Sequence, residues 1–315
     1  MRHFLRDDDL TPDEQRDVLE LAARLKADRA GGGSAVRPLA GPRAVAVLLD
    51  KPTLRTQLSF AVGIAELGGY PMLVDGRLAQ IGVRESVADT ARVLGRQVAA
   101  VVWRTYDQSR VEEMAAHAGV PVVNALTDQF HPCQVLADLL TIAEHRGADG
   151  VAGLPGRTLA YLGDGSNNMA HSYLLGGATA GLHVRVATPP ERAPLPDVVA
   201  RAEQVAGRTG GSVLVTASVG EAVAGADAVA TDTWVSMGDE TSTDEAAALF
   251  SPYRLDAAVL GQAAPDAVVL HCLPAYRGME VTADVLDGPQ SAVFDEAENR
   301  LHAQKALLVR LLEWS

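Results

Sequence analysis

The residues of this sequence that could do chemistry are grouped in six short polar segments, and each follows an apolar run typical of a buried strand. The first, Lys51–Thr56, brings Arg55 and Thr56 to the expected start of a helix, where the helix dipole and a guanidinium group together favour a bound anion. The others are Arg104-Thr105, His131–Gln134, Gly163–Asn168, Asp232–Gly238 and His271–Pro274. Within them, Asn167 and Asn168 suit the ammonium or carboxylate of a zwitterion.

Taken singly, these residues also have structural explanations. Arg104 could be a surface arginine, His131 a packed and hydrogen-bonded histidine, and Cys133 and Cys272 inert buried thiols. Their shared position weakens these explanations, because ligands of open α/β sheets bind outside the carboxyl ends of the strands. We therefore expect one site in the cleft between two lobes.

Several other kinds of site are disfavoured by the sequence. The turn Gly163-Asp164-Gly165 lacks the third glycine of a dinucleotide-binding loop, since Asn168 stands in its place. We find no phosphate-binding GxxxxGK[ST] loop, no GxSxG nucleophile motif and no paired-histidine zinc motif. The expected protein uses no metal and no cofactor.

The amino-acid composition of the chain disfavours some kinds of binding partner. The 315 residues carry a formal net charge of −13, with no long basic run, which argues against nucleic acid and anionic membranes as partners. Hydrophobic residues make up 48% and aromatic residues only 4%, so the core must consist mainly of Ala, Val and Leu. Two cysteines and a first segment without a signal-peptide pattern favour a cytoplasmic protein.

The elements that must position the polar segments alternate between short apolar runs and helical stretches. This pattern predicts an α/β fold of two doubly wound parallel-sheet lobes, joined by interlobe helices. The predicted strands are Ala44–Leu49, Pro71–Val74, Val98–Trp103, Pro121–Val123, Thr158–Leu162, Val184–Ala187, Ser212–Thr216, Ala228–Thr231, Ala267–Leu270 and Ala292–Phe294.

Helix signals complete this organisation. Thr11, Pro12 and Glu14 predict a capped helix start. A second helix is expected from about Arg55 to Gly68, with Leu58, Val62, Ala65 and Ile64 or Leu67 on its buried face. We place the first domain at residues 1–147 and the second at 148–296, with a terminal helix at 297–315 that packs back on the first domain.

Together the segments resemble a known family, the aspartate/ornithine carbamoyltransferases, and within it the ornithine carbamoyltransferases. The resemblance covers essentially the whole chain. It rests on the motifs Lys51–Thr56, His131-Pro132-Cys133-Gln134, Asp232 with Ser236-Met237-Gly238, His271-Cys272-Leu273-Pro274 and Asp295–Arg300.

The resemblance implies the substrates and their ligands. Carbamoyl phosphate would be bound by Thr53, Leu54, Arg55, Thr56, Gln80, Arg104, His131, Gln134, Cys272, Leu273 and Arg300. L-Ornithine would be bound by Asn168, Asp232, Ser236 and Met237. The catalytic set would be Arg55, Arg104, His131 and Cys272. The products would be L-citrulline and phosphate, as in arginine biosynthesis.

Further expectations also come from the resemblance. Relatives have a cis Leu–Pro peptide at the position of Leu273-Pro274, and they form homotrimers or multiples of trimers. In those trimers, the residue matching Gln80 reaches the site of a neighbouring subunit. The loop Ser236–Thr243 would close after ornithine binds and expel water.

Three departures from the family pattern keep alternatives open. The usual loop reads Ser-Thr-Arg-Thr-Arg, whereas this chain has Leu54 and Gln57 at its second and fifth positions, and Tyr276 replaces a usual histidine. One alternative is a carbamoyltransferase for a different diamino acid in a specialised pathway. The other is a catalytically weakened regulatory paralogue, for which the lost charge at Gln57 is the best argument.

Overall fold

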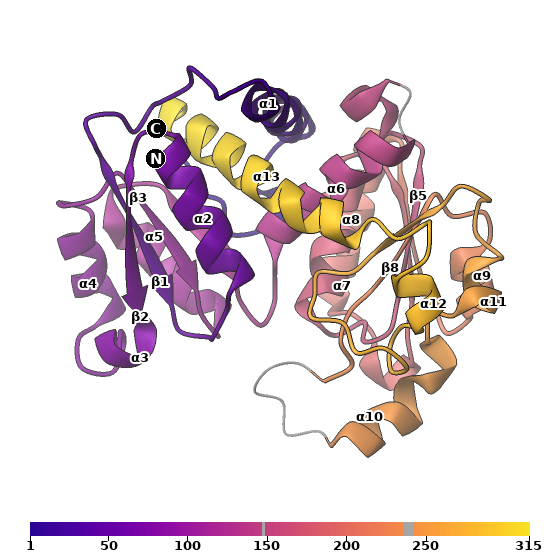
Figure 1. Ribbon diagram of the computed structural model, residues 1–315. Helices are drawn as coiled ribbons and strands as arrows, with labels where there is room; N and C mark the ends of the chain where they lie inside the picture. Colours follow the sequence, from indigo (N-terminus) through magenta and orange to yellow (C-terminus); the bar gives the residue numbers. More distant parts are fainter. Residues whose placement is uncertain (147–148, 236–241) are drawn as a thin grey trace. The chain divides into compact units, whose positions relative to one another are not determined.

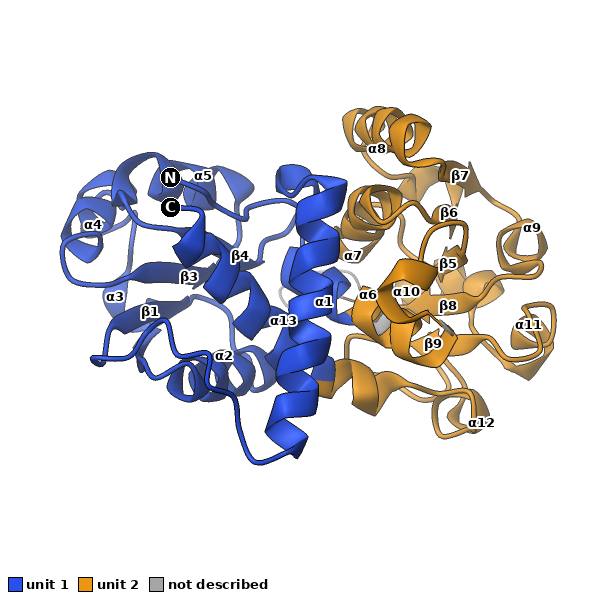
Figure 2. Ribbon diagram, turned by 90° about the horizontal axis from the view of Figure 1, so that it is seen from above, with its two compact units in different colours: residues 1–137, 299–315 blue, residues 138–298 orange. Residues whose placement is uncertain are grey.

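The computed structural model describes residues 1–146, 149–235 and 242–315. It contains two compact units, residues 1–137 with 299–315 (unit 1) and residues 138–298 (unit 2), which Figure 2 shows in blue and orange. Both are α/β units with entirely parallel sheets, so the predicted fold class is confirmed. The helices α6 (Pro132–Arg146) and α13 (Val293–Glu313) each begin in one unit and end in the other.

The division between the units therefore falls inside these two helices, after Ala137 and after Glu298. The sequence-based domain boundaries lie after residues 147 and 296. The expectation that polar segments of both lobes meet in one cleft stays a prediction.

Unit 1 contains a four-stranded sheet in the order β2-β1-β3-β4. The strands are β1 (Ala44–Leu49), β2 (Tyr70–Asp75), β3 (Ala100–Arg104) and β4 (Val122–Leu126). The helix α2 (Arg55–Glu66) covers one face of the sheet, and α4 (Val87–Leu94) and α5 (Gln108–Ala118) cover the other (Figures 1 and 2). The unit also contains α1 (Pro12–Ala30) and the short α3 (Gly76–Ala79).

Unit 2 contains a five-stranded sheet in the order β7-β6-β5-β8-β9. Its strands are β5 (Thr158–Leu162), β6 (His183–Ala187), β7 (Ser212–Thr216), β8 (Ala228–Thr231) and β9 (Val268–Leu270). Its helices are α7 (Asn168–Ser172), α8 (Pro196–Thr209), α9 (Val219–Val223), α10 (Thr243–Phe250), α11 (Ala257–Leu260) and α12 (Ala283–Leu286). A π-helical stretch, Tyr173–Gly177, continues α7.

Each sheet reverses its winding direction at one place, and this place determines where ligands are expected. The chain moves outward from β1 to β2 and then returns to β3 on the other side of β1. In unit 2 it moves from β5 through β6 to β7 and then returns to β8. The crevices at these switch points, outside the carboxyl ends of β1 and β3 and of β5 and β8, are the usual ligand sites of such sheets.

One local prediction is wrong, and another is only partly correct. The run Ala292–Phe294 is not a strand, because only a single bridge joins Ser291 to β9 and the chain enters α13 at Val293. The buried face of α2 was predicted only in part: Ile64 and Leu67 are buried, but Leu58 is 59% exposed and Ala65 is exposed. Thr56, Ser59 and Gly63 are buried instead. The reason is packing against α13, since a β-carbon on Gly63 would lie only 3.0 Å from Lys305 Cγ.

Candidate active site

The first switch point, in unit 1, is lined by cations. Arg104 ends β3 and is only 5% exposed, and Arg55 is the first residue of α2 after β1. Arg300 on α13 is buried, and its Nη2 donates to Thr56 Oγ1 at 2.7 Å. Segments far apart in the sequence thus bring their guanidinium groups to the same end of the sheet.

A neutral histidine lies among these cations. His131 is buried directly before α6, next to the completely buried Gln134. Burial lowers the pKa of His131 well below its usual 6.5, and the positive charges of Arg300, Arg104, Arg55 and Lys51 lower it further. The imidazole is therefore uncharged at neutral pH, and one of its ring nitrogens carries a proton that it can donate.

The loop between β1 and α2 is held in place by a hydrogen bond within it and by contacts of Lys51. Thr53 Oγ1 accepts a long hydrogen bond from the backbone N–H of Thr56 (3.4 Å), while Leu54 occupies the N-cap position with a side chain that is 74% exposed. The Nζ of Lys51 forms an ion pair with Asp128 and lies 4.7 Å from the ring centroid of Tyr106. These contacts hold the predicted phosphate loop beside the strand ends.

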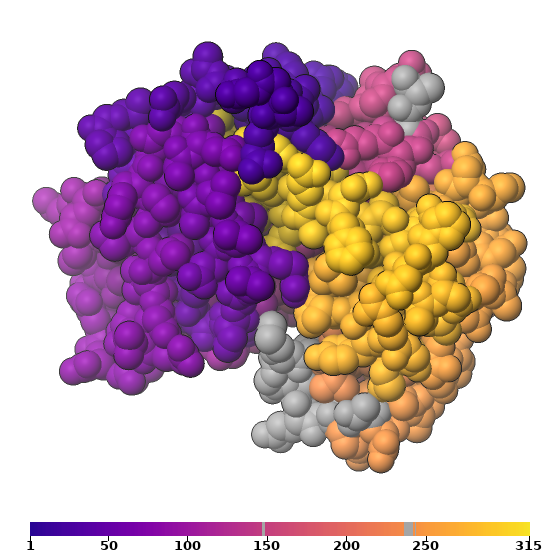
Figure 3. Space-filling view, viewed as in Figure 1, coloured from indigo at the N-terminus to yellow at the C-terminus, as the bar shows by residue number. Residues whose placement is uncertain are grey.

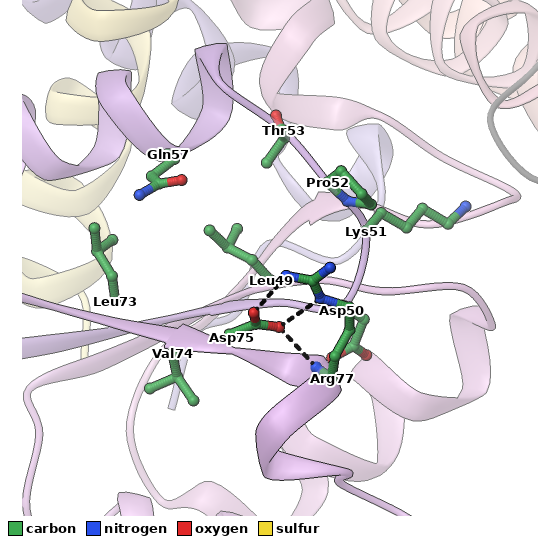
Figure 4. A pocket seen from close by; sticks show the side chains of 10 residues that line it. All are labelled: Leu49, Asp50, Lys51, Pro52, Thr53, Gln57, Leu73, Val74, Asp75 and Arg77. Carbon is green, nitrogen blue, oxygen red and sulfur yellow. Dashed lines mark hydrogen bonds and ion pairs between the residues drawn. The ribbon is translucent and has the colours of Figure 1, made fainter.

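A cavity of about 280 Å³ adjoins this loop (Figure 4). Thr53 and Gln57 line it, together with the ion-paired Asp75 and Arg77, whose Nη2 lies 2.7 Å from Asp75 Oδ2. Gln57, at a position where the family pattern has arginine, therefore faces open space beside the phosphate loop.

Asp50 was missed by the sequence analysis, although it directly follows β1. Its Oδ2 accepts hydrogen bonds from Trp103 Nε1 (3.1 Å) and Thr105 Oγ1 (2.5 Å), the residues on either side of Arg104. Its side chain is nearly buried. A carboxylate at the end of an otherwise apolar strand was the signal that could have identified it.

Gln80 belongs to another segment of unit 1. It follows α3, which comes directly after the edge strand β2, whereas Arg104 ends β3 and His131 follows β4. Its side chain is exposed, and its backbone has the left-handed conformation, with φ of 49°.

The second switch point, in unit 2, has the opposite electrostatic character. Asn168 begins α7 after β5, and Asp232 follows β8. Cys272 Sγ donates to Asp232 Oδ1 at 3.2 Å. Burial raises the pKa of Asp232. Burial and the negative charges of Asp232 and Glu296 raise the pKa of Cys272 well above its usual range. The thiol is therefore protonated at neutral pH.

The turn after β9 is held by a buried histidine. His271 Nδ1 accepts a hydrogen bond from the Leu273 N–H (2.9 Å), and Nε2 lies 3.1 Å from Glu280 Oε1. Leu273 has φ of 56°, and the peptide Leu273-Pro274 is cis, as the resemblance implied. Ser236 and Met237 lie outside the residues that the structure describes.

Asp232, His271 and Cys272 also bring potential metal ligands within 4.8 Å of one another. Both ring nitrogens of His271 are already engaged, however, and the Cys272 thiol is bonded to Asp232. The contacts of this group therefore shape the turn itself.

Among the described residues, no helix is long and apolar enough to cross a membrane.

Comparison with known proteins assigns the class. Residues 2–144 match the carbamoyl-P binding domain of the aspartate/ornithine carbamoyltransferases, and residues 155–311 match the Asp/Orn binding domain of the same family. The chain belongs to the aspartate/ornithine carbamoyltransferase family.

Individual relatives have a more specific name than the family, ornithine carbamoyltransferase. The chain is 60% identical over 314 residues to the ornithine carbamoyltransferase of Clavibacter sepedonicus, covering 100% of this chain and 99% of that one. It is also 60% identical over 311 residues to that of Bifidobacterium longum subsp. infantis, covering 99% and 95%. The solved ornithine carbamoyltransferase of Pyrococcus furiosus superposes with a TM-score of 0.92 at 43% identity, covering 98% of this chain and 96% of that one.

Proposed function

We propose that the protein transfers the carbamoyl group of carbamoyl phosphate to the side-chain amine of L-ornithine, giving L-citrulline and phosphate. The observation that carries this proposal is the gathering of Arg55, Arg104 and Arg300 around the neutral His131. Such a group of side chains suits a small dianion that also has a carbonyl group. The relatives named above carry the same activity in their names.

In the proposed donor site, the start of α2 with Thr53, Leu54 and Thr56 binds the phosphate, together with Arg55, Arg104 and Arg300. The helix dipole and the guanidinium forks both favour the dianion. Gln134 and the backbone carbonyls of Cys272 and Leu273 accept the hydrogens of the carbamoyl amide. The exposed side chain of Leu54 fits a role through the backbone, so the missing hydroxyl there costs little.

Catalysis is proposed to depend mainly on orientation and electrostatics. As the amine attacks, negative charge grows on the carbonyl oxygen, where Arg104, His131 and Thr56 stabilise it. A neutral His131 serves as a hydrogen-bond donor and not as an acid. The departing phosphate accepts the proton of the attacking amine, so no strong protein base is required.

The acceptor site is proposed to be the polar group of unit 2, with Asn168, Asp232, Ser236 and Met237 binding the amino-acid end of ornithine. Cys272 would lie beside the attacking amine, and its protonated thiol would exclude competing nucleophiles. Because the donor carbon must meet the acceptor amine, both sets of side chains are proposed to serve one reaction.

The proposed assembly is a homotrimer in which Gln80 serves a neighbouring subunit. Large apolar side chains are exposed on the edge strand β2 and on and just before α2, a helix that lies at the front of Figures 1 and 3. They are Leu54, Leu58, Tyr70, Met72 and Leu73. An exposed edge of this kind favours association with another copy. Light scattering should give about three times 33.1 kDa, and a monomer mass would contradict the assembly.

The proposed setting is arginine biosynthesis in the cytoplasm. Cys133 and Cys272 are both free thiols, which fits a reducing compartment. The domain roles follow the same scheme, with carbamoyl phosphate on residues 1–147 and ornithine on residues 148–296.

The direct test is an acceptor panel with carbamoyl phosphate. Purified protein should form citrulline from L-ornithine and far less product from diamino acids one methylene shorter or longer. Preference for another acceptor would replace ornithine while keeping the chemistry. No carbamoylation of any amine at saturating substrates would favour the weakened paralogue.

A further inference from the structure

The turn that carries Gln80 is exposed but well defined. Leu78 and Val83, on either side of Gln80, are each 80% exposed. The backbone nevertheless forms a closed turn, because the Gln80 N–H donates to Gly76 O (2.8 Å) and the Gln80 carbonyl accepts from the Val83 N–H (3.0 Å). A side chain that must reach another subunit needs such a fixed base.

Arg110, on α5, attaches this turn to the body of unit 1. Its Nη2 donates to Ile81 O at 2.7 Å and lies 3.4 Å from Asp50 Oδ2. Its guanidinium lies over the Trp103 ring, 5.1 Å from the centroid. A β-carbon on Gly82 would lie 3.3 Å from Arg110 Nη1, so the turn passes closely over the guanidinium.

Asp50 and Ile81 complete this anchor. The Ile81 side chain is 5% exposed and belongs to the same core cluster as Trp103. A β-carbon on Gly76 would lie only 1.8 Å from Asp50 Oδ1, so the start of α3 rests on the same carboxylate that Arg110 faces. The turn is therefore held at Gly76, Ile81 and Gly82 while Gln80 stays exposed.

We propose that Arg110 is a positioning residue that fixes the Gln80 turn for the donor site of a neighbouring subunit. The proposal rests on the proposed function, in which Gln80 acts across a subunit boundary. It makes a directional claim: Arg110 acts through its own chain's Gln80 on the next subunit. The contrary possibility is action on its own site, through Asp50, Thr105 and Arg104.

Single variants give the first measurement. Arg110→Met should raise the KM for carbamoyl phosphate about tenfold with a smaller change in kcat. The freed turn would no longer hold Gln80 against the donor, and one lost hydrogen bond to the donor weakens binding by about that factor. Arg110→Lys, which keeps a charge over Trp103, should restore part of the affinity. Arg92→Met is the matched control, since Arg92 forms an exposed ion pair with Asp89 (2.8 Å) on α4, and its KM should be unchanged.

Hybrid trimers test the direction. Differently tagged Arg55→Ala and Arg110→Met chains are co-expressed, and particles carrying both tags are purified. In a hybrid, the Arg110→Met chain can supply an intact Arg55, and the Arg55→Ala chain can supply an intact Gln80 turn. A site that combines the two is complete. The hybrids should therefore recover activity with a wild-type KM, although each parent trimer is impaired. If the hybrids keep the raised KM of the Arg110→Met parent, Arg110 acts within its own site and the proposal is wrong.

Controls separate this inference from the proposed function. Hybrids of Arg55→Ala with Gln80→Ala must also recover activity; if they do not while the wild type makes citrulline, Gln80 has no role across subunits and the inference fails with it. Thermal unfolding and light scattering establish that each variant is folded and trimeric. If Arg110→Met does not fold, Arg110→Lys replaces it in the hybrids, with the same two outcomes.

Discussion

The two switch points of this molecule are built alike and charged oppositely. In unit 1, the cations Arg55, Arg104 and Arg300 surround the buried His131 and lower its pKa. In unit 2, burial and acidic groups raise the pKa values of Cys272, Asp232 and Tyr161. The same sheet geometry thus serves two different ligands, because the residues after the strands determine the sign of the local field.

This contrast explains how a chain with a net charge of −13 can bind a dianion. The guanidinium groups around the buried His131 outweigh distant surface charges, which salt screens over about 10 Å. The acidic surroundings in unit 2 suit the cationic amino acid that is proposed to bind there. The following predictions test each half of the contrast.

The largest effect is expected from Arg55→Ala. It removes a cation at the start of α2 and should lower kcat/KM by at least about a thousandfold, as loss of a charge-stabilising group does in comparable sites. Citrulline assays measure the loss, and unchanged circular dichroism and thermal unfolding establish that the fold is intact. Near-normal activity would remove Arg55 from the mechanism.

A smaller effect is expected from Asp232→Asn in unit 2. The substitution keeps the shape but removes the charge that faces the Cys272 thiol, and should lower kcat/KM for ornithine about a hundredfold. Affinity for carbamoyl phosphate, measured by calorimetry without ornithine, should stay within about twofold of wild type. An equal loss for both substrates would contradict the division of roles.

The neutral state of His131 predicts a pH dependence of stability. Because its folded pKa lies below the unfolded value of 6.5, the unfolded chain binds more protons as the pH falls below 6.5. This group's contribution is therefore fully present above pH 6.5 and is lost as the pH falls toward the folded pKa, by about 1.4 kcal/mol per pH unit at most. We expect the free energy of unfolding, measured with denaturant between pH 7 and 5, to fall less steeply with decreasing pH in His131→Asn than in the wild type. Equal slopes would mean that folding does not lower the pKa of His131.

The smallest effect is expected from Gln57→Arg, which restores the family's usual residue beside the cavity of Figure 4. An added exposed cation near the phosphate loop should lower the KM for carbamoyl phosphate by about twofold to fivefold, and salt should reduce the gain. Gln57→Lys tests whether charge alone suffices. A large rise in kcat would instead support a wild-type enzyme weakened by its loop.

Much of the fold could be predicted because the strands are buried on both faces and read as apolar runs. Nine of the ten predicted strands appear as β1 to β9, four of them with the expected bounds. The tenth, Ala292–Phe294, failed because a short apolar run fits both a strand and the first turn of a helix. The buried face of α2 was predicted correctly at Ile64 and Leu67 but not at Leu58, because α13, far away in the sequence, determines which side of α2 is covered.

The candidate site residues were predicted from their positions after strands and from the resemblance, whereas their supports were not. Asp50 and Arg110 act through contacts among β1, β3, α5 and the Gln80 turn. Nothing in the local sequence distinguishes Arg110 from a surface arginine on a helix. Such residues become visible only when the packing brings three or more segments together.

The central claim is that the cations around His131 bind the phosphoryl end of the donor. Calorimetry with a bisubstrate analogue that joins a phosphonate, a carbamoyl-like amide and ornithine measures this directly. We expect one analogue to bind per chain in the wild type, and binding at least about a hundredfold weaker in Arg55→Ala. Equal affinity of the two proteins for the analogue would contradict the account.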